Sequence, residues 1–206
     1  MKVVIGALEL DSSNVARSVK DVPAEHGPQT ERGRLEKLRH WDQRAWTQFF
    51  KEYESKIITL CVAMTRDQAV AQDICADTFV RVVSSIDKFR ENSSIKTWIY
   101  TIARNLCLTH LARAKRTVSL DDEMADVLPD RSPGAEQAVA DREVDTVLQE
   151  AIGQLDPLLR EALLLRVTGD LSYSEIAQIT GIPAATVATR VHRAREQLRR
   201  RLARVL

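Results

Sequence analysis

Apolar residues recur at intervals of three and four along most of the chain, which is the spacing of one helix face. One helix is predicted by Trp46, Phe49, Phe50 and Tyr53, followed by Ile57, Ile58, Cys61 and Val62. Asp67 is expected to cap a second helix, because its carboxylate can accept free amides at a helix N-terminus. The polar stretch 89–94 breaks the pattern, and a third helix follows from Ile95 to about Arg116. These helices predict one domain over residues 40–116.

Two stretches lack this pattern. Residues 1–39 contain Ser, Asn, Pro and Gly without sustained periodicity, so we expect a mostly disordered extension, with a helix beginning near Thr30. Residues 117–145 hold nine acidic side chains against two arginines, with two prolines among them. We therefore predict an acidic flexible linker over residues 117–138, with a helix resuming near Gly134.

A second helical domain is predicted over residues 139–206. One helix is expected to end near Leu155, and another to run from Pro157 to Thr168. Ser172 and Glu175 have the spacing of a capping box, in which each side chain satisfies the other residue's backbone amide. The fold class is thus all-α, with two small helical domains joined by the acidic linker.

The end of the second domain has the pattern of a helix-turn-helix. Ala177 is a small residue for close packing, Gly181 supplies the turn, and Val187 is an apolar anchor on the following helix. That helix continues into seven arginines against the single acid Glu196, although the net charge of the 206 residues is only +1. A basic run alone is typical of a solvated helix. Joined to the helix-turn-helix spacing, it indicates DNA binding.

The third predicted helix carries a second basic stretch, Arg104 to Arg116, with no acid between Glu91 and Asp121. Single-stranded DNA binds cationic grooves with exposed aromatic rings, on which each base stacks for about 1–3 kcal/mol. We interpret Trp98 as a core residue. Tyr100 is offset from the apolar stripe and is expected to be exposed.

Other chemistry has little support in the sequence. Cys61, Cys75 and Cys107 lie among apolar neighbours and form no CxxC pair, which indicates buried, reduced thiols in a cytoplasmic protein. The four histidines are scattered, and no phosphate loop or nucleophile motif is present. We expect no enzyme activity, metal or cofactor. No run approaches the ~20 apolar residues of a membrane helix, so no membrane insertion is expected.

Two stretches match a known family. Residues 71–79 (AQDICADTF) and 96–105 (KTWIYTIARN), with Phe89 between them, resemble region 2 of the extracytoplasmic-function (ECF) sigma factors of the sigma-70 family. Residues 171–177 (LSYSEIA) and 182–190 (IPAATVATR) are similar to region 4. The resemblance implies an alternative sigma factor that binds core RNA polymerase, recognises the minus-ten and minus-thirty-five promoter elements and initiates transcription of a specific regulon.

The resemblance also implies contact residues. For polymerase, through its β′ clamp helices with the β flap as a further contact, they are Gln72, Asp73, Asp77 and Arg81. For the minus-ten element, where the loop would capture a flipped base, they are Phe89, Asn92, Ser93, Ser94, Tyr100, Thr101 and Asn105. For the minus-thirty-five element they are Thr186, Ala188, Thr189, Arg190, His192, Arg193 and Arg195. Family members are commonly held inactive by an anti-sigma factor, so such a partner is expected.

Three positions depart from the family pattern. Ala76 replaces a usual Gln, which weakens one expected polymerase contact, and Ala185 replaces a common Gly. Ala188 stands where Lys or Arg is frequent, so one DNA contact is expected to be missing. The preferred promoter sequence is therefore expected to differ from that of relatives. The alternative hypothesis is a conventional helix-turn-helix regulator that binds a palindromic operator without being a polymerase subunit.

Overall fold

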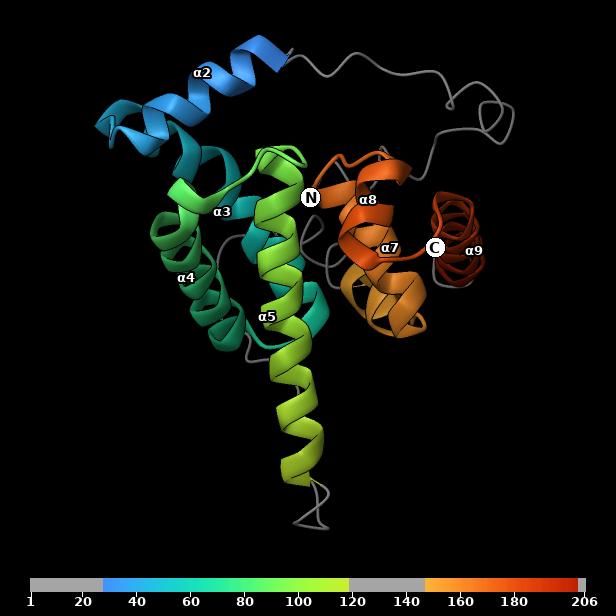
Figure 1. The fold of residues 1–206 in the computed structure, drawn as a ribbon. Helices are drawn as coiled ribbons and strands as arrows, with labels where there is room; N and C mark the ends of the chain where they lie inside the picture. The colour runs from blue at the N-terminus through green and yellow to red at the C-terminus, as the bar shows by residue number, and fades with distance from the viewer. Residues whose placement is uncertain (1–27, 119–146, 204–206) are drawn as a thin grey trace, which may run out of the picture.

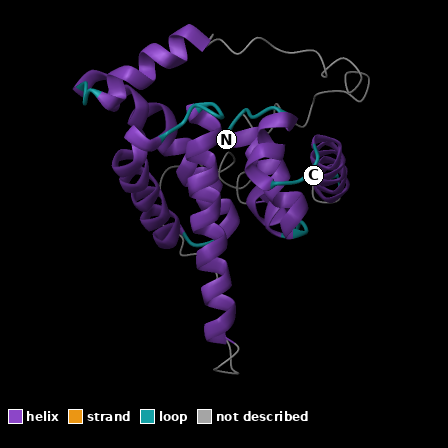
Figure 2. Cartoon of the chain, viewed as in Figure 1, coloured by secondary structure: helices purple, strands orange, loops and turns teal. Residues whose placement is uncertain are grey.

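The computed structural model of the protein describes residues 28–118 and 147–203. Every regular element in these two ranges is a helix (Figure 2). The first range holds α2 (Pro28–Arg39), α3 (Gln43–Thr65), α4 (Gln68–Ser85), the short 3₁₀ helix η2 (Ile86–Lys88) and α5 (Ile95–Val118). The second holds a helix at residues 147–153, then α7 (Pro157–Thr168), α8 (Tyr173–Thr180) and α9 (Ala184–Leu202). These observations confirm the all-α prediction.

Side-chain caps fix where the helices begin. Asp67 accepts a hydrogen bond from the Val70 N–H at 3.0 Å, as predicted, and Asp42 does the same for Ala45 at 2.8 Å. Asp156 caps α7, whose first residue is the expected Pro157. Each cap satisfies an amide that the helix itself leaves free, which is worth about 1 kcal/mol.

The two domains pack against each other and share one core. In the first, α3 packs on both α4 and α5, with Phe49, Ile57 and Leu60 fully buried. In the second, α7 and α8 both pack on α9. Contacts between α3 and α7 and between α5 and α8 join the domains, so α5 lies between α4 and the second domain (Figure 1). The C-terminal half of α5 projects beyond the bundle (Figure 1).

The predicted domain boundary at residue 40 is wrong for α2. Residues 28–39, expected within a mostly disordered extension, form a helix that packs on α3 and η2, with Leu35 and Leu38 buried. The helix begins close to the expected Thr30, but its sequence is so rich in charge that two leucines are its main apolar signal. The rest of that extension and most of the predicted linker, residues 119–138, lie outside the described residues.

Shortening a side chain of α2 that is buried in the core tests this packing. Leu38→Ala removes a fully buried side chain, so the free energy of unfolding of the full chain is expected to fall by about 2–5 kcal/mol in urea titrations. Glu36→Ala, two residues earlier on the exposed face, is the matched control and should change it little. Equal effects of the two substitutions would show that α2 is not part of the core.

Candidate nucleic-acid interface

The face of α4 that was predicted to bind polymerase is exposed to solvent. Gln72, Asp73, Asp77 and Arg81 are all exposed, while Ile74, Cys75 and Thr78 point into the core. Asp73 and Asp77 are four residues apart, so they project from the same side of the helix. Val80 follows on this side and is 65% exposed.

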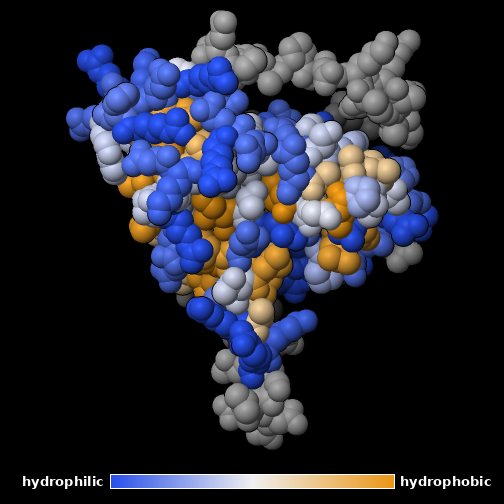
Figure 3. Space-filling model, viewed as in Figure 1, coloured by the Kyte–Doolittle hydropathy of each residue, from blue (hydrophilic) through white to orange (hydrophobic). Residues whose placement is uncertain are grey.

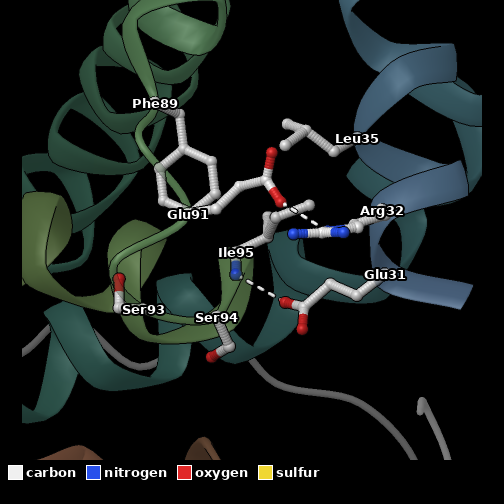
Figure 4. Close-up of a pocket in the computed structure, with 8 residues that line it drawn as sticks. All are labelled: Glu31, Arg32, Leu35, Phe89, Glu91, Ser93, Ser94 and Ile95. Atoms are coloured by element: carbon white, nitrogen blue, oxygen red, sulfur yellow. Dashed lines mark hydrogen bonds and ion pairs between the residues drawn. The ribbon is translucent and has the colours of Figure 1, made fainter. Parts of the chain in front are cut away.

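The loop between η2 and α5 lies beside a pocket of about 320 Å³ (Figure 4). The ring of Phe89 lines it and stacks at 4.7 Å on Trp98, which is half-buried as a core residue would be. Ser93 and Ser94 lie on the same wall, whereas Asn92 is exposed in the loop. The residues that line the pocket are Glu31, Arg32, Leu35, Phe89, Glu91, Ser93, Ser94 and Ile95.

Helix α2 supplies the other wall and holds the loop in place. Glu31 accepts the first amide of α5, that of Ile95, at 2.7 Å (Figure 4). Arg32 pairs with Glu91 at 3.2 Å, and Arg39 donates to the Phe89 carbonyl at 2.6 Å. The sequence analysis missed these three residues, because they lie in the segment that was expected to be disordered.

Tyr100 is buried, so its expected exposure was wrong. Its side chain is fully enclosed, and its hydroxyl donates to the Thr168 carbonyl of α7 at 3.1 Å. Burial raises the pKa of this phenol above its ordinary value, so the hydroxyl stays protonated and remains a donor. Tyr100 is offset from the apolar stripe of its own domain because it packs on the other domain. Thr101 is half-buried and Asn105 is exposed.

Polar contacts surround Tyr100 and join α5 to the second domain. Arg104 forms an ion pair with Glu161 at 2.7 Å, with side chains only 17% and 8% exposed. At the other end, the Lys96 ammonium donates to the Asp170 carbonyl at 3.0 Å and lies 3.8 Å from the Glu175 carboxylate. Lys96, Tyr100 and Arg104 are spaced by four residues, so one stripe of α5 faces the second domain. That stripe includes Arg104, which was expected to belong to a basic surface for DNA.

The helix-turn-helix has the predicted geometry. Ser172 and Glu175 form the capping box, with the Glu175 N–H 3.2 Å from the Ser172 hydroxyl and the Ser172 N–H 2.8 Å from the carboxylate. Gly181 ends α8 at φ 73, a left-handed conformation that glycine adopts without cost. Val187 and Val191 are fully buried, as expected.

The outer face of α9 carries the residues that were predicted to read duplex DNA. Thr186, Thr189, His192 and Arg193 are exposed, and Ala188, Arg190 and Arg195 are half-buried. Pro183 precedes the first turn, which has no acidic residue. An exposed, uncapped N-terminal turn with short side chains can approach the floor of a major groove closely.

Arginines gather beside the N-terminus of α8. Burial, reinforced by repulsion from Arg166 and Arg199, lowers the pKa of Arg195, while the nearby Tyr173 acts in the opposite direction. Its Nε is buried and has no hydrogen-bond partner among the described residues. Arg166, which the sequence analysis missed, lies 5.8 Å from the Tyr173 ring. This cluster suits a phosphate, which would partner the desolvated guanidinium.

The described residues offer neither a metal site nor a membrane span. No group of three or more His, Cys, Asp or Glu side chains within residues 28–118 and 147–203 could hold a metal ion. The same ranges contain no helix long and apolar enough to span a bilayer. All three cysteines are buried free thiols, as predicted. Figure 3 shows hydrophilic side chains over α2 and, at the opposite end of the molecule, on the projecting end of α5.

The ion pair between the domains can be tested by a double-mutant cycle. Arg104→Met and Glu161→Leu each leave one buried charge unpaired, so each is expected to lower the free energy of unfolding by about 3–5 kcal/mol. The double variant should cost less than the two single costs together, with a coupling of about 0.5–3 kcal/mol in urea titrations. Strictly additive costs would contradict a direct interaction.

Comparison with known proteins identifies both domains. Residues 49–117 match the family described as Sigma-70 region 2, and residues 146–198 match Sigma-70, region 4. The chain is 33% identical over 183 residues to the ECF RNA polymerase sigma factor SigW of Bacillus subtilis, covering 82% of this chain and 95% of that protein. It is 34% identical over 174 residues to the RNA polymerase sigma-H factor of Pseudomonas aeruginosa, covering 80% and 89%.

Solved structures share the fold. The sigma factor RpoE of Bartonella quintana, solved with the anti-sigma factor NepR, has a TM-score of 0.62 at 23% identity, over 77% of this chain and 96% of that one. CnrH, solved with the cytosolic domain of CnrY, has a TM-score of 0.61 at 20% identity, over 84% and 97%. With both regions in order and relatives matched over most of their length, the chain belongs to the ECF sigma factors of the sigma-70 family.

Proposed function

We propose that this protein is an alternative sigma factor that binds core RNA polymerase, recognises both promoter elements and directs initiation at a specific set of promoters in the cytoplasm. The observation that carries the proposal is the match of both sigma-70 regions, in order, to one folded chain. The protein itself makes and breaks no bonds. It supplies the polymerase with DNA recognition and with binding energy that offsets the cost of opening the duplex.

Polymerase binding is assigned to α4. Its exposed face would contact the β′ clamp helices through four side chains, those of Gln72, Asp73, Asp77 and Arg81. Ala76, exposed between the two aspartates, offers no hydrogen bond where the family usually has Gln. The β flap is assigned to the second domain.

The minus-ten element is assigned to the loop and its pocket. Taking a base out of the stack costs a few kcal/mol, which contacts in a pocket must return. The pocket beside Phe89 has a suitable size and carries an aromatic ring, two serine hydroxyls and carboxylates. The loop residues Asn92, Ser93 and Ser94 would contact this base, and Tyr100, Thr101 and Asn105 would line the neighbouring strand path.

The minus-thirty-five element is assigned to α9. With its N-terminal half in the major groove, the exposed Thr186, Thr189, His192 and Arg193 would reach base edges. Ala188 can offer only a methyl contact, which suits a thymine methyl and not a hydrogen-bonding edge. Arg190 and Arg195 would hold phosphates, joined by Arg166 beside the N-terminus of α8.

The docked domains cover part of the minus-ten surface. Tyr100 is fully buried and Arg104 is paired with Glu161, so neither can contact DNA in this arrangement. A promoter also presents its two elements to separate parts of the chain. We therefore infer that polymerase binding separates the domains, and that the free protein binds promoter DNA weakly. An anti-sigma factor that holds the docked form would keep the protein inactive, and the structural relative RpoE of Bartonella quintana is solved with such a partner.

In-vitro transcription tests the proposal. Purified core polymerase would be incubated with and without the protein on a fragmented genomic library from the host. Defined start sites that occur only with the protein, each preceded by both elements, are expected. If no initiation occurred, although the folded protein alone bound a palindromic operator at nanomolar affinity, the protein would be a conventional helix-turn-helix regulator.

If α9 reads base edges, removal of one of its exposed side chains should lower the transcript yield. Arg193→Ala removes an exposed guanidinium from the reading face, and a lost base contact of about 1–3 kcal/mol should lower transcript yield about tenfold or more. Gln197→Ala, one turn further along and equally exposed, is the control and should retain full yield. Equal yields from both variants on a promoter that requires its upstream element would contradict the assignment.

A further inference from the structure

The turn between α2 and α3 contains a residue in an unfavourable conformation. Trp41 has a φ of 57, in the left-handed region. Its N–H donates to the Leu38 carbonyl at 3.1 Å and the Asp42 N–H donates to the Lys37 carbonyl at 2.9 Å, which is the hydrogen-bond pattern of a Schellman motif. The left-handed residue of this motif is usually glycine, and a side chain there costs about 1–2 kcal/mol.

Packing in the free protein does little to offset this cost. The Trp41 side chain is 61% exposed, and its one ring contact among the described residues is with Trp46, at 6.0 Å between centroids. A bulky side chain held in a strained conformation and left open to solvent suggests a role outside the fold.

A chain of aromatic rings connects Trp41 with α4. Trp46 lies 5.7 Å from Phe50, and Phe50 lies 4.9 Å from Phe79 on α4. The residue after Phe79 is Val80, 65% exposed, which continues the stripe formed by Asp73 and Asp77. Trp41 and Val80 are two of the four large exposed apolar side chains in the described ranges, and the ring contacts lead from the turn that carries Trp41 to the helix that carries Val80 and the face assigned to polymerase.

We propose that Trp41 and Val80 form an apolar extension of the polymerase-binding face, with Trp41 as an anchor that inserts into core polymerase. The inference rests on the proposed function, because it names further contacts of the same partner. Protein interfaces typically combine buried aromatic anchors with a polar rim, here supplied by Asp73, Asp77 and Arg81. A base of the opened promoter is a less suitable partner, because Trp41 is not among the residues that line the pocket.

The test separates stability from binding. Trp41→Gly suits the left-handed turn, so the free energy of unfolding should be unchanged or higher, whereas the affinity for core polymerase should fall about tenfold. Affinity would be measured by competition with fluorescently labelled wild-type protein. Val80→Ser should weaken binding in the same direction. Leu108→Ser, which changes another exposed apolar residue on α5, is the control and should leave binding to core unchanged.

Three results would overturn the inference. If Trp41→Gly lost stability as well as affinity, Trp41 would be a structural residue. If all variants bound core like the wild type, the extension would not exist, although the proposed function would stand. If core binding were normal but promoter opening were lost, Trp41 would contact DNA. Failure of the wild-type protein itself to bind core would instead reject the proposed function.

Discussion

The docking of the two domains along α5 determines what the rest of the structure can do. Its centre is Tyr100, fully buried with its hydroxyl on the Thr168 carbonyl, beside the ion pair of Arg104 and Glu161 at 2.7 Å. Burying an ion pair costs desolvation energy that the attraction between the two charges only partly offsets. The pair therefore contributes less to the free energy of unfolding than to fixing which surfaces of the two domains meet. Breaking it leaves a charge in a closed interface, whereas separating the domains returns both charges to water.

This property suits an interface that must open. The surface that region 4 covers includes residues assigned to the minus-ten element, so docking and the proposed DNA binding would compete for the same side of α5. The competing groups are both anions. In the docked form the carboxylates of Glu161 and Glu175 contact the cations of α5, and on DNA the phosphates would contact the same cations. The α4 face and the outer face of α9 remain exposed in the docked form. Under the proposed function, polymerase would therefore bind first, before the second domain moves.

Local chemistry in the sequence predicted much of the fold. The Asp67 cap, the Ser172 and Glu175 capping box and the Gly181 turn each depend on residues within four positions of one another, and all three are confirmed. The periodicity likewise placed the described helices after residue 40. The assigned contact residues were identified by resemblance alone, and they remain predictions.

The errors arose where distant parts of the chain meet. Two leucines, Leu35 and Leu38, are too short an apolar pattern to predict that α2 packs in the core. The pocket wall that Glu31 and Arg32 of this helix form was therefore not predicted either. Tyr100 was expected to be exposed because the stripe of its own domain excludes it, yet it is buried by α7 of the other domain. Periodicity within one helix cannot reveal which second domain will cover it.

Energy transfer between fluorophores on the two domains tests the central claim most directly. Bioorthogonal labels would replace Ser55 on α3 and Gln197 on α9, both exposed and on different domains. We expect efficient transfer in the free protein and a marked loss when core polymerase is added, because the domains separate. Transfer that stayed equally efficient in a polymerase complex able to initiate transcription would contradict it, since the minus-ten surface would then remain covered.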